Sequence, residues 1–460
     1  MDSAVVPPAT PPAPAGEPAL PASDVDGVDG VDGPGRRGRW AGVDGGLGSA
    51  FARLWTAAGI STVGDGLTQT AVPLLAATLT RDPFRIGLIS AVQYLPWLLL
   101  GLPGGALVDR WDRTRTMWTV DLARAAAIAA LAAAVLAGAV SVPLLVLAAF
   151  CLGTGQIFFD GAAQAAIPAA VGREPARLHR ANGRLLGTRT VGGSFVGPPV
   201  GGLLFTAARW LPFVADAVSF LASSALIASL RGRLATEAPP PRRRLRTDMA
   251  EGLRFLLRHQ VLRTCAVMAC VCNLAGATAF GLLVLLAQDR LGLGSAGFGA
   301  LLTAEAAGAL VGSVIAARLA RLVGSAVAFC QLQVAFGLAT VLVGVAGSVP
   351  LAALGLGLTG LTVGAWNVLG QSLRQELTPG RLMGRVVTAF RMIGMGGAPL
   401  GGVLGGLLAR QYGLTTTYVV AGAAVVAAGL AATPVLTERR VAAARAAVDT
   451  AAAAAVNPAA

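Results

Sequence analysis

Long apolar runs dominate this chain. From Leu54 onward, runs of roughly 18–25 residues follow one another, each long enough to cross a hydrocarbon core about 30 Å thick as a helix. Because unsatisfied backbone groups cannot face lipid, and because no segment alternates as barrel strands do, we expect helices. The expected spans lie near residues 54–78, 86–107, 117–138, 143–168, 186–207, 210–230, 262–287, 296–317, 324–346, 350–372, 387–409 and 414–436. The sequence thus predicts an all-α transmembrane fold of twelve helices.

Composition excludes a soluble protein. Hydrophobic residues make up 55% of the 460 residues and charged residues only 13%, with a mean hydropathy of +0.68, whereas soluble domains carry about 25% charged residues. The net charge of +13 comes from 36 basic residues, all of them Arg. These Arg residues fall in short clusters between the apolar runs and form no single basic face, so we expect no nucleic-acid partner.

The Arg clusters indicate how the chain lies in its membrane. Alternate loops are rich in Arg, and the loops between them hold few basic residues. By the positive-inside rule, we expect the Arg-rich loops and both termini in the cytoplasm, in a multi-pass protein of the inner or plasma membrane. The Arg-rich loops contain Arg110, Arg113 and Arg115; Arg173, Arg177, Arg180 and Arg184; Arg231 to Arg263; Arg318 and Arg321; and Arg374, Arg381 and Arg385.

The longest connection divides the expected spans six and six. It contains three consecutive prolines, Pro239 to Pro241, and then Met249 to Arg258, which is predicted to form an amphipathic helix on the inner membrane face. The predicted organisation is a disordered cytoplasmic tail over 1–49, a six-helix bundle over 50–230, a basic linker over 231–261, a second bundle over 262–437 and an Ala-rich cytoplasmic tail over 438–460.

The two predicted bundles repeat each other. Phe159-Asp160 near the end of the fourth span corresponds to Trp366-Asn367 in the tenth, and each is followed by a basic loop and a helix rich in Gly and Pro. Repeats of this kind predict a pseudo-two-fold arrangement in which one bundle rocks against the other around a cavity near the midplane.

Scarce carboxylates inside apolar spans are candidates for coupling ion movement to transport, because an ionisable group there costs about 2.5–3.5 kcal/mol on insertion scales. Asp65, Asp160 and Glu305 are the proton-coupling candidates; hydrogen bonding that only joins helices is the alternative for each. A structural role is expected for Asp216 and for the pair Asp121 and Arg124.

Amide and aromatic side chains in the same spans are candidates for lining the cavity, with plain helix packing as the alternative. Together they suit an amphiphilic organic molecule. These candidates are Gln69, Gln93, Tyr94, Gln156, Phe159, Asn273, Trp366 and Asn367.

Three motifs carry a family resemblance that covers about residues 50–440. The loop from Gly105 to Arg115 after the second span resembles the signature loop of the major facilitator superfamily. In the fifth span, Gly-x-x-x-Gly-Pro-x-x-Gly-Gly from Gly193 to Gly202 resembles the antiporter motif of its drug exporters. Glu251 to Leu256, and Ser372 to Gln375 with Gly384-Arg385-Val386, resemble the branch of siderophore and macrolide exporters.

The resemblance implies roles for two of these motifs. The loop would close the cytoplasmic side in one state through Gly105, Asp109, Arg110 and Arg113, unless it is only a static anchor. The helix motif of Gly193, Gly197, Pro198, Gly201 and Gly202 would limit leak, unless it only packs small residues. The Arg often found in the fourth span of these exporters is absent around Ala148 to Gly153.

The sequence therefore predicts a secondary active transporter, exporting small amphiphilic molecules such as a drug, antibiotic, siderophore or secondary metabolite in exchange for protons. An uptake transporter of the same fold and a non-transporting receptor or scaffold are the alternatives. The five Cys and two His residues match no metal spacing, and no phosphate-binding Gly-rich loop is present. We expect no enzyme activity, catalytic residue, cofactor or metal, and a monomer whose partners are its small-molecule substrate, protons and the lipid bilayer.

Overall fold

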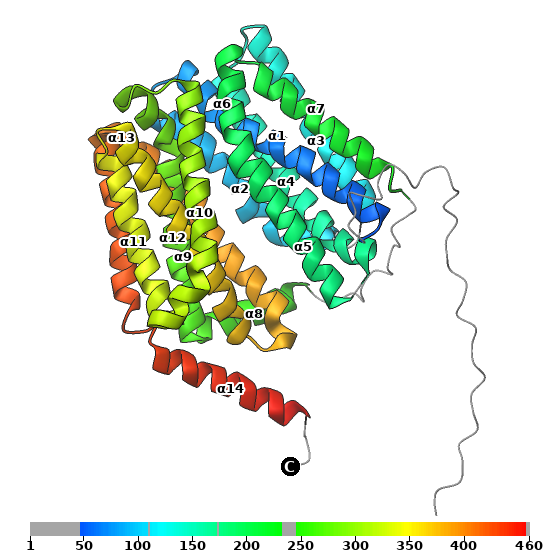
Figure 1. Ribbon diagram of the computed structural model, residues 1–460, viewed down its shortest axis with the longest axis vertical. Helices are drawn as coiled ribbons and strands as arrows, with labels where there is room; N and C mark the ends of the chain where they lie inside the picture. Colours follow the sequence, from blue (N-terminus) through cyan, green and yellow to red (C-terminus); the bar gives the residue numbers. More distant parts are fainter. Residues whose placement is uncertain (1–46, 109–110, 173, 232–244, 457–460) are drawn as a thin grey trace, which may run out of the picture.

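The computed structural model describes residues 47–108, 111–172, 174–231 and 245–456, and this part of the chain is helical with no β-strand. Figure 1 shows the helices side by side in a single molecule. In chain order they are α1 (Ser49–Leu79), α2 (Pro83–Val108), α3 (Arg113–Leu136), α4 (Val142–Val171), α5 (Pro175–Arg189), η1 (Thr190–Val196), α6 (Gly197–Ala207), α7 (Leu211–Ala228), α8 (Leu245–Arg258), α9 (Gln260–Leu285), η2 (Leu286–Arg290), α10 (Ser295–Val323), α11 (Ser325–Val345), α12 (Val349–Glu376), η3 (Gly380–Leu382), α13 (Met383–Ala432) and α14 (Glu438–Val456).

Within these described residues, nine helices are long and apolar enough to cross a membrane. The helical, membrane-spanning class predicted from the sequence is confirmed. Three features separate this number from the twelve expected spans. The helix α1, which covers the span expected near 54–78, is not among the nine. The span expected near 186–207 is divided among α5, the π-helix η1 and α6, and the two spans expected near 387–409 and 414–436 lie within the single α13.

Gly413 interrupts α13. Its φ of 83° and ψ of 166° lie outside the helical region, and glycine adopts a positive φ without the steric cost that a Cβ brings. The break falls between the two spans that the sequence predicts there, so α13 consists of one helix before Gly413 and another after it.

The helices pack in two sets whose contacts correspond. Before the linker, α1 contacts α6 and α7, α3 contacts α4 and α7, and α2 contacts α4. After the linker, α9 and α11 contact α13, and α12 contacts α10 and α11. We call these sets the N-terminal half and the C-terminal half. Extensive contacts between the halves join α2 to α13 and α6 to α10.

The two halves share an apolar core at one end of the molecule. That core takes Leu74 and Phe213 from one half and Leu283 and Phe298 from the other. We call it the joined end; α2 and α10 begin there. Glycines allow the backbones to meet: a Cβ on Gly402 would lie 2.7 Å from the Gly87 carbonyl oxygen.

At the opposite end each half has a core of its own. One contains Phe51, Met117 and Ile167 of the N-terminal half, and the other contains Leu262 and Phe329 of the C-terminal half. The halves are thus fastened together at the joined end and packed separately at the other.

Two helices that the sequence does not count as spans, α8 and α14, lie at this opposite end, toward the bottom of Figure 1. The helix α8 includes the segment predicted to be amphipathic, and an ion pair joins its Glu251 to Arg385 of α13. In α14, Glu438 accepts a hydrogen bond from the Ala326 backbone N–H at 2.6 Å, and Arg445 pairs with Glu376 at 2.5 Å. Side-chain contacts therefore fix both helices to the C-terminal half.

Candidate functional site

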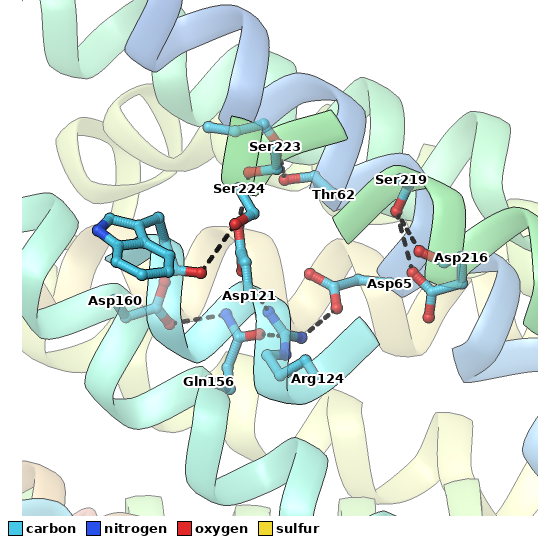
Figure 2. Close-up of polar contacts among 12 residues, drawn as sticks. Thr62, Asp65, Asp121, Arg124, Gln156, Asp160, Asp216, Ser219, Ser223 and Ser224 are labelled. Atoms are coloured by element: carbon cyan, nitrogen blue, oxygen red, sulfur yellow. Dashed lines mark hydrogen bonds and ion pairs between the residues drawn. The ribbon is translucent and has the colours of Figure 1, made fainter. Parts of the chain in front are cut away.

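A buried guanidinium organises the polar side chains of the N-terminal half. Arg124 of α3 is only 4% exposed and pairs with Asp65 of α1, whose side chain is 33% exposed. The same Arg124 nitrogen donates to Gln156 Oε1 of α4 at 2.9 Å, and the guanidinium carbon lies 4.1 Å from the centre of the Phe220 ring. Figure 2 shows Arg124 between Asp65 and Gln156. A charge buried this deeply is stable only when it is paired, so Arg124 and Asp65 form one unit.

A second carboxylate faces the same guanidinium. Asp121 lies one turn before Arg124 on α3, is fully buried, and places Oδ1 3.8 Å from Arg124 Nη1. Its other oxygen accepts a hydrogen bond of 2.6 Å from Ser223 Oγ of α7. Two carboxylates therefore share one guanidinium in the interior of this half.

The network continues through α4 to a second arginine. Gln156 donates through Nε2 to Asp160 Oδ2 at 3.0 Å, and Arg189 Nη2 at the end of α5 donates to Asp160 Oδ1 at 2.5 Å. The four-residue spacing of Gln156 and Asp160 puts both on one face of α4. Polar contacts thus lead without interruption from Asp65 to Arg189.

Asp216 has hydroxyl partners. Thr68 Oγ1 donates to one of its oxygens at 2.5 Å and Ser219 Oγ to the other at 3.1 Å. It is 1% exposed and lies to the right of Asp65 in Figure 2. These contacts join α1 to α7, in agreement with the structural role expected from the sequence.

A cavity of about 440 Å³ lies next to the charged network and mostly in the C-terminal half. Gln69 connects the two, since it lies one helical turn beyond Asp65 on α1 and lines the cavity. Five of the eight predicted cavity residues line this space, and so does Glu305, which was predicted as a coupling residue; the five are Gln69, Tyr94, Asn273, Trp366 and Asn367.

Three predicted cavity residues lie elsewhere. Gln156 belongs to the charged network. Phe159 is 4% exposed and packs in the core of the N-terminal half. Gln93 is exposed but is not among the residues that line the cavity. All three are on α2 or α4, helices that are apolar around most of their circumference, so their sequences do not show which face turns inward.

Within the cavity, Glu305 of α10 differs from the carboxylates of the N-terminal half. Asp65 and Asp160 each pair with an arginine, whereas Glu305 forms no hydrogen bond or ion pair with any described residue. Trp366 stacks on Phe329 with ring centres 4.5 Å apart. The cavity therefore combines one carboxylate with aromatic and amide groups.

The glycine motif of the fifth predicted span forms the contact between α6 and its neighbours. A Cβ on Gly201 would lie 2.8 Å from the Leu67 carbonyl oxygen of α1, and one on Gly193 would lie 3.0 Å from Thr62 Cγ2. Gly197 packs on Gly66, and Gly202 approaches Ser295 of α10. Pro198 lies against Gly299 of α10 and also lines the cavity. The motif thus packs against both halves.

Half of the predicted gating loop, Asp109 and Arg110, lies outside the described residues. Gly105 lies in the last turn of α2, and Arg113 begins α3. Asp112 caps α3 by accepting a hydrogen bond from the Arg115 backbone N–H at 2.6 Å. The gating role stays a prediction.

Sequence reasoning missed the two arginines that organise the network. It assigned Arg124 a structural role and gave Arg189 no role in the site. The available signal was the cost of an arginine in the middle of an apolar span, which makes it as strong a candidate as a carboxylate. Arg124 is an intramembrane arginine of α3, whereas the fourth span has none around Ala148 to Gly153.

The described residues form no candidate metal site, because no three or more of their His, Cys, Asp or Glu side chains are grouped so as to hold an ion. The five cysteines are free thiols.

The fold is that of known membrane transporters. A bacterial homologue of the iron transporter ferroportin in its inward-facing state aligns with a TM-score of 0.67 and 16% identity, over 83% of this chain and 97% of that one. The nucleoside transporter NupG aligns with a TM-score of 0.67 and 13% identity, over 84% and 98%. The helical fold and its apolar spans therefore define a multi-pass membrane protein that shares the fold of these transporters.

The family follows from the sequence match. The family model described as "Transmembrane secretion effector" matches residues 47–457, so the chain belongs to this family of the major facilitator superfamily. It is 27% identical to the multidrug efflux pump Tap of Mycolicibacterium fortuitum over 77% of this chain and 88% of that one. It is 28% identical to the enterobactin exporter EntS of Escherichia coli O127:H6, over 78% and 85%. The predicted resemblance to the drug and siderophore exporters is confirmed, and the protein is a transporter and no enzyme.

Proposed function

We propose that this transporter exports small amphiphilic organic molecules in exchange for protons. The observation that carries the proposal is the pairing of Arg124 with Asp65 while Asp121 faces the same guanidinium. This charged group lies one helical turn from a cavity that is mostly apolar. A site for protons and a site for an organic molecule are therefore adjacent and carried by different halves.

Two six-helix bundles are part of this proposal. The corresponding contacts within the two halves support it, as does the division of α13 at Gly413. Counting α5, η1 and α6 as one span and α13 as two gives six spans on each side of the linker.

The orientation supports loading from the cell interior. The Arg-rich loops lie at the ends of α2, α4, α7, α10 and α12, opposite the joined end, and the positive-inside rule assigns them to the cytoplasm. The joined end then faces outward, and the cavity is closed on that side. In this state the cavity exchanges its contents with the cytoplasm, which is the side from which an exporter loads its substrate.

Coupling follows from charge balance in the network. With Asp65, Asp121 and Asp160 ionised against Arg124 and Arg189, the network has one negative charge in excess. A proton that binds to one of these carboxylates neutralises the excess negative charge. It weakens the ion pair between Arg124 and Asp65, and this changes how α1 packs on α3. For a neutral substrate, one proton crossing about 100 mV releases about 2.3 kcal/mol, which sustains roughly a fiftyfold gradient. For a monocation the exchange moves no net charge, and the pH difference alone drives it.

The direction and the substrate class are supported by the relatives, which are named as a multidrug efflux pump and an enterobactin exporter. Uptake by the same fold is the alternative, and transport assays in vesicles of known orientation separate the two. A non-transporting receptor finds no support in these relatives.

The test uses everted membrane vesicles whose lumen is acidified by respiration. Adding ethidium or erythromycin to vesicles that contain the wild-type protein should release protons from the lumen, read as recovery of acridine orange fluorescence. Asp65→Asn should abolish this release. The matched control is Asp449→Asn on the exposed face of α14, which should behave as wild type. Equal fluorescence recovery in Asp65→Asn and wild type would contradict coupling through this network.

A further inference from the structure

The described residues that line the cavity include one acidic residue, Glu305, and no basic residue. Glu305 comes from the middle of α10, and the backbone there is tightly fixed because its carbonyl oxygen lies against Gly360 of α12. The opposite wall includes Gln69 and Tyr94 of the N-terminal half. Tyr94 of the N-terminal half and Tyr418 of the C-terminal half line the same cavity, so Glu305 shares it with aromatic side chains of both halves.

This carboxylate lacks the partners that the other intramembrane carboxylates have. An isolated carboxylate away from water is costly unless a cation or hydrogen-bond donors satisfy it. No described arginine pairs with Glu305. A cation supplied from outside the chain would complete the site.

The rest of the lining indicates an organic cation. Phe280, Phe336 and Trp366 offer aromatic surface, and the face of such a ring attracts a positive charge by about 0.5–2 kcal/mol. An inorganic divalent cation would require several oxygen ligands, but the lining supplies one carboxylate and a few amides. An anionic ligand would meet Glu305 and no basic side chain.

We infer that the cavity is a binding site for lipophilic organic monocations, such as quaternary ammonium or phosphonium ions and protonated aromatic amines, with Glu305 as the counter-charge. This inference rests on the proposed function and specifies its substrate class. The two halves then have different roles: the N-terminal half contains the proton network, and the C-terminal half binds the cation.

Equilibrium binding tests the inference without transport. The probe is radiolabelled tetraphenylphosphonium, and its neutral counterpart is triphenylphosphine oxide, bound to the purified full chain in lipid nanodiscs. Wild-type protein should bind the cation at least about tenfold more tightly than the neutral analogue, a comparison that requires no variant. Glu305→Gln should weaken cation binding at least about tenfold and leave the affinity for triphenylphosphine oxide within about twofold. Glu305→Asp should retain most of the cation affinity.

The matched control is Glu174→Gln, since Glu174 precedes α5 on the exposed surface and makes no side-chain cap hydrogen bond. It should bind both probes as wild type does. Equal affinities of wild type for the two probes would overturn the inference, as would a Glu305→Gln variant that binds tetraphenylphosphonium with wild-type affinity.

The proposal of proton-coupled export and the proposal of a cation site can be contradicted independently. Selective cation binding without proton release from everted vesicles would leave the cation site standing and remove proton coupling. Proton release driven by erythromycin, combined with no preference for the cation, would leave proton-coupled export standing and remove the cation site.

Discussion

Arg124 and Asp65 form an ion pair in which the arginine is almost completely buried, at 4% exposure, and the carboxylate is 33% exposed. This difference gives the two residues different tasks. Arg124 is held from several sides by Asp121, Gln156 and the Phe220 ring. In the proposed function, Asp65 is the partner that takes up the proton, and its protonation would weaken the ion pair that joins α1 to α3.

Removing one member of this pair should cost more stability than removing both. Arg124→Gln leaves the partly exposed Asp65 and the buried Asp121 without their cation, and breaking a fully buried pair costs about 3–5 kcal/mol, which is the upper limit here. Asp65→Asn in the same chain removes one of the carboxylates left behind. We expect the double variant to unfold at a higher temperature than Arg124→Gln alone. Thermal unfolding of the four proteins in detergent, arranged as a double-mutant cycle, measures the coupling energy.

The exposed residue pair Arg439 and Asp449 of α14 provides the reference for that cycle, because these two residues share no contact. Arg439→Gln and Asp449→Asn should have small effects that add. Additive losses for Arg124 and Asp65 would show that the pair contributes no mutual stabilisation.

Sequence alone located the acids of this network but not their arrangement. Asp65 and Asp160 are conspicuous because each is a rare charge in an apolar span. Their partners come from other helices, since Arg124 is 59 residues from Asp65 and Arg189 is 29 residues from Asp160. Helical periodicity fixes neighbours three and four residues apart and contains no information on the register between helices. The partners therefore could not be assigned before the helices were packed.

The spans themselves were predictable, because their lengths follow from the bilayer thickness. It was harder to predict which face of each span packs in a core and which face lines a cavity. Phe159 and Trp366 occupy corresponding places in the repeat, yet Phe159 packs in a core while Trp366 lines the cavity. Both are aromatic residues in strongly apolar helices, so hydrophobicity did not distinguish the face that packs from the face that lines a cavity.

The contact between α1 and α6 should be sensitive to a single methyl group. A Cβ on Gly197 would lie 2.5 Å from the Gly66 Cα, so Gly197→Ala must push the two backbones apart. We expect it to destabilise the protein by about 1–3 kcal/mol and to slow substrate efflux. Gly187→Ala in α5 is the matched control, because its Cβ would meet no atom within 4 Å. That control should be neutral or stabilising by up to about 1 kcal/mol. Equal unfolding temperatures for the two alanine variants would contradict close packing here.

An ion pair bridges the two halves at the joined end. Arg81, between α1 and α2, lies 2.8 Å from Asp289 of η2 and also donates to Gln288 at 2.9 Å. Both charged side chains are about half exposed, so the pair is worth at most about 1 kcal/mol. We expect Asp289→Arg to replace this attraction with repulsion and to raise the fraction of molecules open at the joined end up to about fivefold.

Labelling of Cys272, which lines the cavity, measures that opening. In right-side-out vesicles, with the other four of the five cysteines replaced by serine, a membrane-impermeant maleimide should label Cys272 faster in Asp289→Arg than in the parent protein. The swapped pair Arg81→Asp with Asp289→Arg should return the labelling rate to that of the parent. A labelling rate unaffected by charge reversal would exclude this pair as a contact that favours the closed state.

His259 should make the start of α9 sensitive to acid. Its Nδ1 accepts a hydrogen bond from the Leu262 backbone N–H at 3.3 Å, which requires the neutral ring. Burial lowers the pKa of His259 below its usual 6.5. The unfolded state therefore takes up the proton more readily than the folded state, and the stabilisation, complete at higher pH, declines as the pH falls below about 6.5. We expect the unfolding temperature of wild type to decrease over this interval relative to His259→Asn, because asparagine caps a helix without titrating. The difference between the two proteins, measured from pH 8 to about pH 5, isolates the histidine from all other groups. A difference that does not change with pH would show that His259 does not titrate in this cap.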